Sequence, residues 1–207
     1  EICACLVGSE MCIRDSYLYN ASNTWIASVW RCAYQALDRA NVAIASIEAM
    51  SGFAENRNLQ EIDGQARFLR AYIAFDLVKF FGDVPFSTEY TNGFANTSKP
   101  RTDRELIYDQ IIEDLNYAKT YLKSGREVAS SEIPCSGAAH TLLMRVYLQR
   151  AGYSLNCSSR QLTRPDDTTR KGYFEAVIKE WEALKAEGYH GFYAGGYEPV
   201  SYTHLTL

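Results

Sequence analysis

Residues 64–86 form the most strongly patterned segment of the chain, GQARFLRAYIAFDLVKFFGDVPF. At about 100° per residue along a helix, Arg67 and Arg70 point to one side, while Asp76 and Lys79 point almost opposite. Apolar side chains fill both arcs between them: Phe68, Leu69, Tyr72, Ile73, Phe75, Leu77, Phe80 and Phe81. A helix with two apolar faces packs between neighbours rather than on a surface. The pattern therefore predicts further helices that cover this one.

The same helix is predicted to span about residues 59–81. It should end at Gly82, because Val84 precedes Pro85 and the residue before a proline disfavours the helical conformation. Apolar positions at helical spacing mark four other helices, at about residues 24–50, 102–122, 136–149 and 173–186.

Thr102 and Glu105 are three residues apart, the spacing of a capping box, which predicts that Thr102 begins the third helix. No alternating run of strand length occurs, so the predicted fold class is all-α. Helices in sequence order, joined by connections of about nine to twenty residues, favour stacked antiparallel pairs. Because no repeat period of about 34 residues is visible, the pattern alone is typical of an irregular bundle.

Composition and charge exclude some classes of function. A chain of 207 residues is long enough to bury one sizeable core. Its formal charge is −4 and both signs are interspersed, so the sequence predicts no basic surface for nucleic acid. No run of eighteen apolar residues indicates a membrane span. Cys32, Cys135 and Cys157 are far apart and form no CxxC pair, so no disulfide framework is predicted.

No motif in the chain predicts catalysis, a cofactor or a metal. His140, His190 and His204 have no zinc-ligand spacing, and the GxSxG, GxGxxG and GxxxxGK[ST] patterns are absent. Asp109 and Glu113 are four residues apart and could share a calcium ion with loop carbonyls. A helix this rich in acids is more typical of a solvated face. We therefore assign no catalytic residue, no cofactor and no metal ligand.

Several polar residues fall on faces that the apolar pattern marks as buried. Arg67 and Arg70 each require a carboxylate or carbonyl partner. We expect Asp114 to be the first such partner, with binding of an anion or sugar acid as the alternative. Asn41 adjoins an apolar stripe and is expected to hydrogen-bond a neighbouring loop rather than a ligand. Asp83 is expected to be a turn residue.

Aromatic residues in loops are the stronger signal for binding, since pockets combine apolar platforms with a few polar groups. One group lies ahead of the first helix: Tyr17, Tyr19, Asn20, Asn23 and Trp25. A second lies in the loop after Pro85: Tyr90, Asn92 and Phe94. The alternative is that tyrosines simply pack helices, as we expect for Tyr34, Tyr72, Tyr108 and Tyr147.

A set of motifs over about residues 25–190 resembles the SusD/RagB family of Bacteroidetes outer-membrane lipoproteins. The motifs are Trp30-x3-Tyr34 with Ala40-Asn41, the run from Gln65 to Tyr72, Phe81-Gly82-Asp83-Val84-Pro85, Arg101, Tyr108, Asp114-Leu115, Ala118, and the run from Arg150 to Leu155. The FLRAY…FGDVP block is the most specific part.

The resemblance implies imperfect tetratricopeptide-like helix pairs and a non-catalytic role. Members capture oligosaccharides or other nutrients for a SusC-like TonB-dependent transporter at the cell outer membrane, to which a lipid anchor attaches them. In the family, the neighbourhood ahead of the Trp30 motif often contributes to ligand contact. Two alternatives remain open: a helical-repeat scaffold for protein–protein interaction, and an α-helical glycan-processing enzyme with carboxylates about 5–10 Å apart.

The two ends of the chain resemble translated adapter sequence, at residues 5–16 and 199–207. Such segments are set aside before the fold is considered. We therefore expect a non-native segment over 1–16, a truncated SusD-like helical-repeat domain over 17–198, and a non-native tail over 199–207.

Overall fold

The computed structural model describes residues 23–93, 98–130, 132–156 and 159–190. Its α-helices are α2 (Thr24–Glu48), α3 (Arg57–Phe81), α4 (Arg104–Tyr121), α5 (Ser136–Ala151) and α6 (Asp167–Ala186). A single-turn 3₁₀ helix, η1 (Phe53–Glu55), joins α2 to α3. The predicted all-α class is confirmed.

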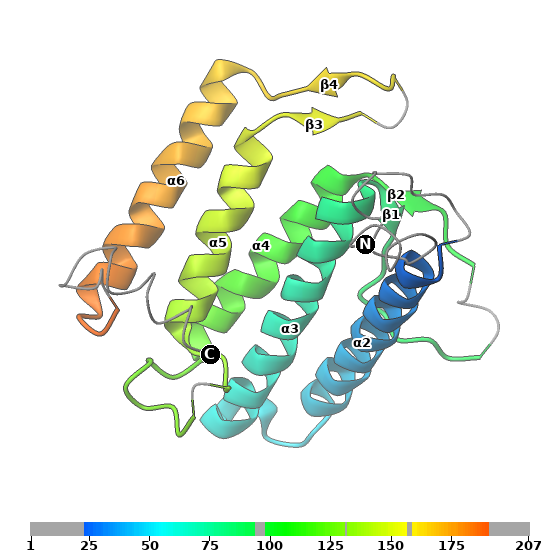
Figure 1. Ribbon diagram of the computed structural model, residues 1–207. Helices are drawn as coiled ribbons and strands as arrows, with labels where there is room; N and C mark the ends of the chain where they lie inside the picture. Colours follow the sequence, from blue (N-terminus) through cyan, green and yellow to red (C-terminus); the bar gives the residue numbers. More distant parts are fainter. Residues whose placement is uncertain (1–22, 94–97, 131, 157–158, 191–207) are drawn as a thin grey trace, which may run out of the picture.

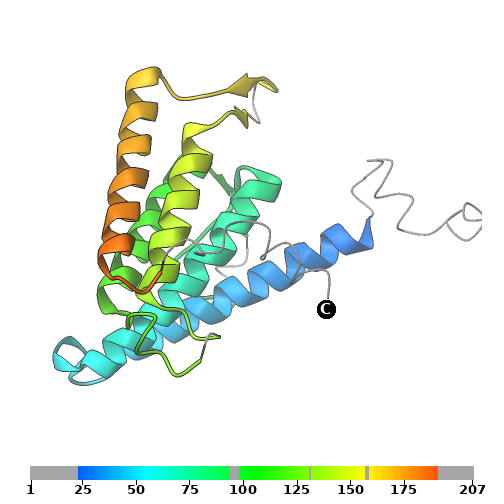
Figure 2. The ribbon, with the colours of Figure 1, turned by 60° about the vertical axis from the view of Figure 1, so that its left-hand side comes forward.

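Each helix packs against the next one in the chain, from α2 at one edge to α6 at the other (Figure 1). Two short antiparallel pairs complete the described part: β1 (Val84–Pro85) with β2 (Arg101–Thr102), and β3 (Ser154–Leu155) with β4 (Leu162–Thr163). The N-terminal end of α2 projects beyond the other helices (Figure 2). Stacked antiparallel helix pairs are therefore the architecture, as predicted.

Helices α2 and α5 begin at the predicted residues, whereas the starts of α3, α4 and α6 differ because of capping side chains. Asn56 and Asp166 each accept backbone N–H bonds from the first turn that follows, so α3 begins at Arg57 and α6 at Asp167. The capping box predicted at Thr102 is wrong. Asp103 caps α4 instead, through Oδ1 and the N–H of Glu105 at 2.9 Å.

Helix α3 lies between α2 and α4, and its buried side chains join the main core. Phe75, Leu77 and Val78 pack with Ile107, Ile111, Leu115, Leu143 and Val146, all of which are almost inaccessible to solvent. Helices α2 and α4 cover α3 on two sides, which confirms the prediction that further helices pack around it.

The third side of α3 remains exposed. Leu69, Tyr72 and Phe80 are 49%, 44% and 68% exposed, so the expectation that Tyr72 packs between helices is wrong. The reason is that Tyr72 borders α5 and Phe80 borders α2 only along open pockets, so neither ring is covered. Tyr108 is buried, and Tyr34 and Tyr147 pack against the core from its edge, as expected.

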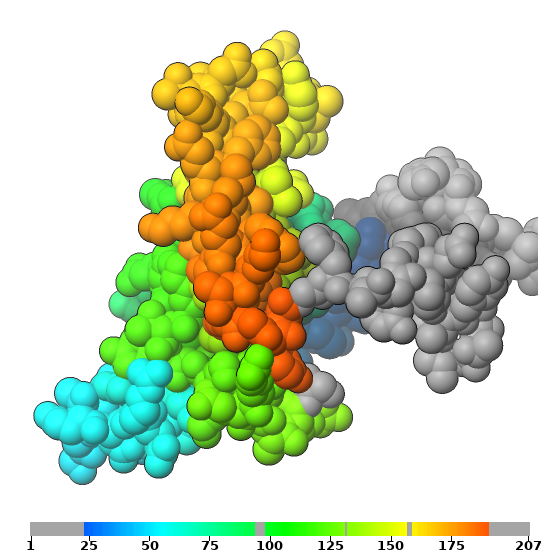
Figure 3. Space-filling view, turned by 90° about the vertical axis from the view of Figure 1, so that its left-hand side faces the viewer, coloured from blue at the N-terminus to red at the C-terminus, as the bar shows by residue number. Residues whose placement is uncertain are grey.

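Helix α6 forms an outer edge of the molecule, and its C-terminal end meets the segment that follows α4 (Figure 3). Only Glu180 and Leu184 of α6 are buried. Glu180 accepts from Lys119 Nζ at 2.7 Å and lies 2.6 Å from His140 Nδ1. Polar contacts to α4 and α5 therefore help to hold this helix in place, together with the packing of Leu184.

Candidate ligand-binding cleft

A cleft of about 490 Å³ separates α2 from the segment between β1 and β2. Helix α2 contributes Trp30, Tyr34, Leu37, Asp38 and Asn41. The opposite wall consists of Pro85, Phe86, Ser87, Glu89, Thr91, Ser98 and Lys99. The volume falls in the range of about 300–1,000 Å³ that is usual for small-molecule sites.

Three side chains on one face of α2 hold the opposite wall through its main chain. The Tyr34 hydroxyl donates to the carbonyl of Pro85 at 2.7 Å, and Asp38 Oδ1 accepts from the N–H of Thr91 at 2.7 Å. Asn41 Nδ2 donates to the carbonyls of Ser87 and Glu89 at 2.8 and 3.2 Å. Because residues four and seven apart share a helix face, these side chains contact successive points of one segment.

Trp30 supplies an aromatic wall whose orientation is fixed by its neighbours. Its ring lies 4.7 Å from the Tyr34 ring and meets the Phe81 ring edge-on at 4.9 Å. Such aromatic pairs stabilise a defined ring geometry. Burial raises the pKa of Tyr34 to about 12, so its hydroxyl stays protonated as the donor to Pro85.

The chemistry of the cleft suits a polyhydroxylated ligand with an apolar face. Trp30 and Tyr34 offer ring surface, and Asp38, Glu89 and Lys99 offer charged groups that can hydrogen-bond hydroxyls. The two carboxylates and one ammonium give mixed charge, so no single sign dominates the lining.

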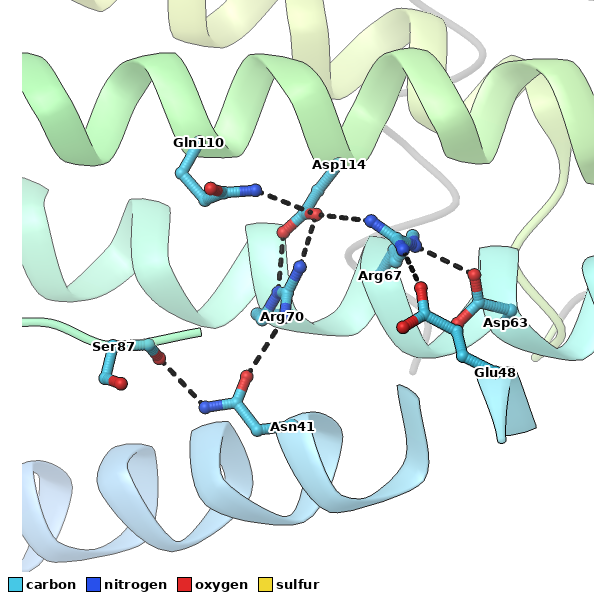
Figure 4. Close-up of polar contacts among 8 residues, drawn as sticks. All are labelled: Asn41, Glu48, Asp63, Arg67, Arg70, Ser87, Gln110 and Asp114. Carbon is cyan, nitrogen blue, oxygen red and sulfur yellow. Dashed lines mark hydrogen bonds and ion pairs between the residues drawn. The ribbon is translucent and has the colours of Figure 1, made fainter. Parts of the chain in front are cut away.

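Below the cleft, a buried polar network joins α2, α3 and α4 (Figure 4). Arg70 donates from Nε and Nη2 to the two oxygens of Asp114, at 2.7 and 2.6 Å, which confirms the predicted partner. Arg70 Nη1 donates to Asn41 Oδ1 at 3.1 Å. Gln110 Nε2 also donates to Asp114 Oδ1 at 3.3 Å, and Arg67 pairs with Asp63 at 2.8 Å and with Glu48.

The electrostatics of this network follow from its burial. Burial raises the pKa of the Asp114 carboxyl, and the hydrogen bonds and charge of Arg70 oppose that rise. For Arg67, burial lowers the pKa of the guanidinium, but the hydrogen bond and charge of Asp63 outweigh burial, and its pKa is raised. Both arginines are thus engaged by carboxylates of the protein, as the structural interpretation of the sequence expected.

The FGDVP turn leads from α3 into the wall of the cleft, which it lines through Pro85. Gly82 has a φ of +71°, a conformation that favours glycine, and Pro85 lies in β1. Asp83 Oδ1 accepts from the backbone N–H of Arg104 at 3.3 Å, so this residue joins the end of α3 to the start of α4. Asp83 is therefore a turn residue, as predicted.

The predicted ligand contacts have mixed positions. Tyr17, Tyr19, Asn20 and Phe94 lie outside the described residues. Asn23 caps α2 through its Oδ1, and Trp25, five residues before Trp30, is 54% exposed. Tyr90 and Asn92 are exposed on the loop that carries the cleft wall. These assignments remain predictions.

Sequence reasoning did not identify Asp38, Glu89 or Lys99 as part of this site. A signal existed for Asp38, because Tyr34, Asp38 and Asn41 follow one another at the spacing of a single helix face. No such signal existed for Glu89 and Lys99, whose positions depend on the path of an irregular segment.

Comparison with known proteins places the chain among SusD-like proteins. A SusD-like family model described as "Starch-binding associating with outer membrane" matches residues 9–148. The SusD-like protein P2 of Formosa agariphila is 26% identical over 140 residues, which are 67% of this chain and 27% of that protein. A SusD-like protein of Bacteroides ovatus is 27% identical over 130 residues, or 62% and 23% of the two chains.

Solved structures have the same fold. A SusD superfamily protein from Parabacteroides distasonis aligns with a TM-score of 0.72 at 23% identity, covering 87% of this chain and 36% of that one. A laminarin-binding SusD-like protein aligns with a TM-score of 0.55 at 25% identity, covering 72% and 29%. The chain thus spans about a quarter of the length of the curated relatives and about a third of these solved chains.

Proposed function

Because this chain belongs to the SusD-like family, we propose that it is part of a glycan-binding protein that captures oligosaccharides at the bacterial outer membrane. Capture is non-catalytic, and the bound oligosaccharide passes to a SusC-like TonB-dependent transporter. A lipid anchor holds the protein at the cell surface. No helix among the described residues combines the length and apolarity needed to cross a bilayer.

The cleft beside α2 is the observation that carries this proposal. It combines a fixed indole ring with carboxylates and an ammonium group, the combination that binds a sugar ring by stacking and by hydrogen bonds to hydroxyls. Trp25 and Tyr90 are exposed on the two elements that form the cleft, but neither belongs to its lining, so their contact with a ligand stays a prediction.

Titration of the 207-residue chain with oligosaccharides of starch, laminarin and xyloglucan tests the proposal. We expect calorimetric binding to at least one of them, and weaker binding for Trp25→Ala and Tyr90→Ala. Loss of one stacking ring should reduce affinity by about fivefold to tenfold, since an aromatic contact contributes about 1 kcal/mol. Phe174→Ala is the matched control, because Phe174 is 42% exposed but lies on α6.

The outcomes separate the alternatives. Unchanged affinity of both Trp25→Ala and Tyr90→Ala, with parent binding intact, removes these residues from the ligand contacts. Absence of binding to every glycan contradicts the proposed function and favours a protein-binding scaffold. Release of reducing sugar that is lost in Asp38→Asn or Glu89→Gln favours the enzyme alternative, which requires a pair of carboxylates.

A further inference from the structure

A directional chain of hydrogen bonds runs from α4 to the wall of the cleft. Asp114 on α4 accepts two bonds from Arg70 on α3, and Arg70 donates onward to Asn41 on α2. Asn41 donates in turn to Ser87 and Glu89 at the cleft wall. The side chains of Asp114, Arg70 and Asn41 are each at most 4% exposed.

The orientation of the Asn41 amide follows from its two neighbours. A guanidinium can only donate and a backbone carbonyl can only accept, so the amide oxygen faces Arg70 and the amide nitrogen faces the loop. Rotating the amide by half a turn would place its N–H groups against Arg70 and its oxygen against two carbonyls. Arg70 is equally constrained, because its bidentate bond to Asp114 fixes the plane of the guanidinium.

We propose that Asn41 is a positioning residue for the cleft, with its amide oriented by the Arg70–Asp114 pair so that it holds the backbone of residues 87–89 in the ligand-binding position. This inference rests on the proposed glycan-binding function. Asn41 is part of the cleft lining on α2. It affects affinity because its hydrogen bonds fix the position of the opposite wall. Positioning is local to the wall, and the helices keep their packing without it.

Asn41→Asp tests the role with little change in size. The carboxylate still accepts from Arg70, but it has no donor for the carbonyls of Ser87 and Glu89, so the loop contact is removed while a negative charge is added beside Arg70. We expect hydrogen exchange of the backbone amides in residues 86–91 to become faster, and exchange in α3 and α4 to stay at the parent rate. Affinity for the oligosaccharide bound by the parent should fall about tenfold, since two hydrogen bonds no longer hold the wall.

Asn58→Asp is the matched control, because it makes the same chemical change at an exposed position of α3 far from the cleft. It should leave exchange and affinity at parent values. A folded Asn41→Asp chain with parent affinity and parent exchange in residues 86–91 overturns the inference. Faster exchange throughout α2, α3 and α4 also overturns it, because Asn41 would then serve general stability.

A second variant keeps the test decisive. If Asn41→Asp does not give the helical circular dichroism of the parent, Asn41→Ser removes the reach to both carbonyls without adding charge. The same two measurements then apply. If the parent binds no oligosaccharide, the proposed function fails, while hydrogen exchange alone still decides whether Asn41 positions the wall.

Discussion

The buried pair between Arg70 and Asp114 should be the most sensitive electrostatic element of this fold. Asp114→Asn removes the only negative charge that directly contacts Arg70 among the described residues, and both side chains are at most 4% exposed. Breaking a buried pair by removing one partner costs about 3–5 kcal/mol. The free energy of unfolding of a domain this size is about 5–15 kcal/mol, so the loss is a large fraction of the total.

The same substitution at an exposed pair gives the control. Asp76 accepts from Lys79 at 2.7 Å, a distance close to those of the buried pair, but the two side chains are 37% and 30% exposed. Asp76→Asn should therefore cost about 0.5 kcal/mol or less. At about 2–4 °C per kcal/mol, we expect the Tm to fall by about 6–20 °C for Asp114→Asn and by less than about 2 °C for Asp76→Asn.

Urea and thermal unfolding, followed by circular dichroism, measure both variants against the parent. A third chain, with Arg70→Met and Asp114→Leu together, removes both charges and should recover part of the stability that Asp114→Asn loses, because no unpaired charge remains buried. Equal losses for Asp114→Asn and Asp76→Asn would refute the reasoning. So would a double variant less stable than Asp114→Asn alone.

Two further variants test the packing of the helices. Ile111→Ala opens a cavity at a fully buried position and should cost about 2–5 kcal/mol by urea unfolding, whereas Leu106→Ala, at a 62% exposed position of the same helix, should cost about 0.5 kcal/mol or less. Burial acts to raise the pKa of Glu180, but hydrogen bonds from His140 and Lys119 outweigh it and hold that pKa below the ordinary value of 4.5. A carboxyl whose pKa is lowered by folding stabilises the fold above its unfolded pKa, and this stabilisation is lost as the pH falls. The difference in Tm between the parent and Glu180→Gln should therefore shrink as the pH is lowered from 7 to 3. Glu182→Gln, at an exposed position, is the control.

The sequence predicted the helices and the need of Arg67 and Arg70 for carboxylate partners, because both follow from the side-chain pattern. Two arginines on an apolar helix need a carboxylate, and Asp114 is a carboxylate on the face of α4 that turns toward the core. The exposed side of α3 could not be predicted in the same way. Periodicity shows that Leu69, Tyr72 and Phe80 are apolar, but it does not show whether another element covers them.

Asn41 bonds a neighbouring loop, as predicted, but the path of the outer wall of the cleft could not be predicted, for a different physical reason. Its outer wall is held through the main chain at Pro85, Ser87, Glu89 and Thr91, and backbone carbonyls and N–H groups are the same for almost any residue. The side chains that make these bonds, Tyr34, Asp38 and Asn41, are all on α2. The side-chain sequence of residues 85–91 therefore does not indicate that this segment forms a wall. The three side chains that bond its main chain lie on one face of α2.

The residues that hold the cleft wall differ from the exposed residues on the same loop. The position of the wall depends on Tyr34, Asp38 and Asn41, and Asn41 depends in turn on the core pair. Side chains at the exposed positions Thr88, Tyr90 and Asn92 make none of the bonds through which α2 holds this wall. Residues at these positions can therefore change what the wall presents to a ligand without changing where it lies. Contacts from α2 therefore set where the wall lies, while the chemistry of the cleft is shared between Trp30 and Asp38 on α2 and Glu89 and Lys99 on the wall.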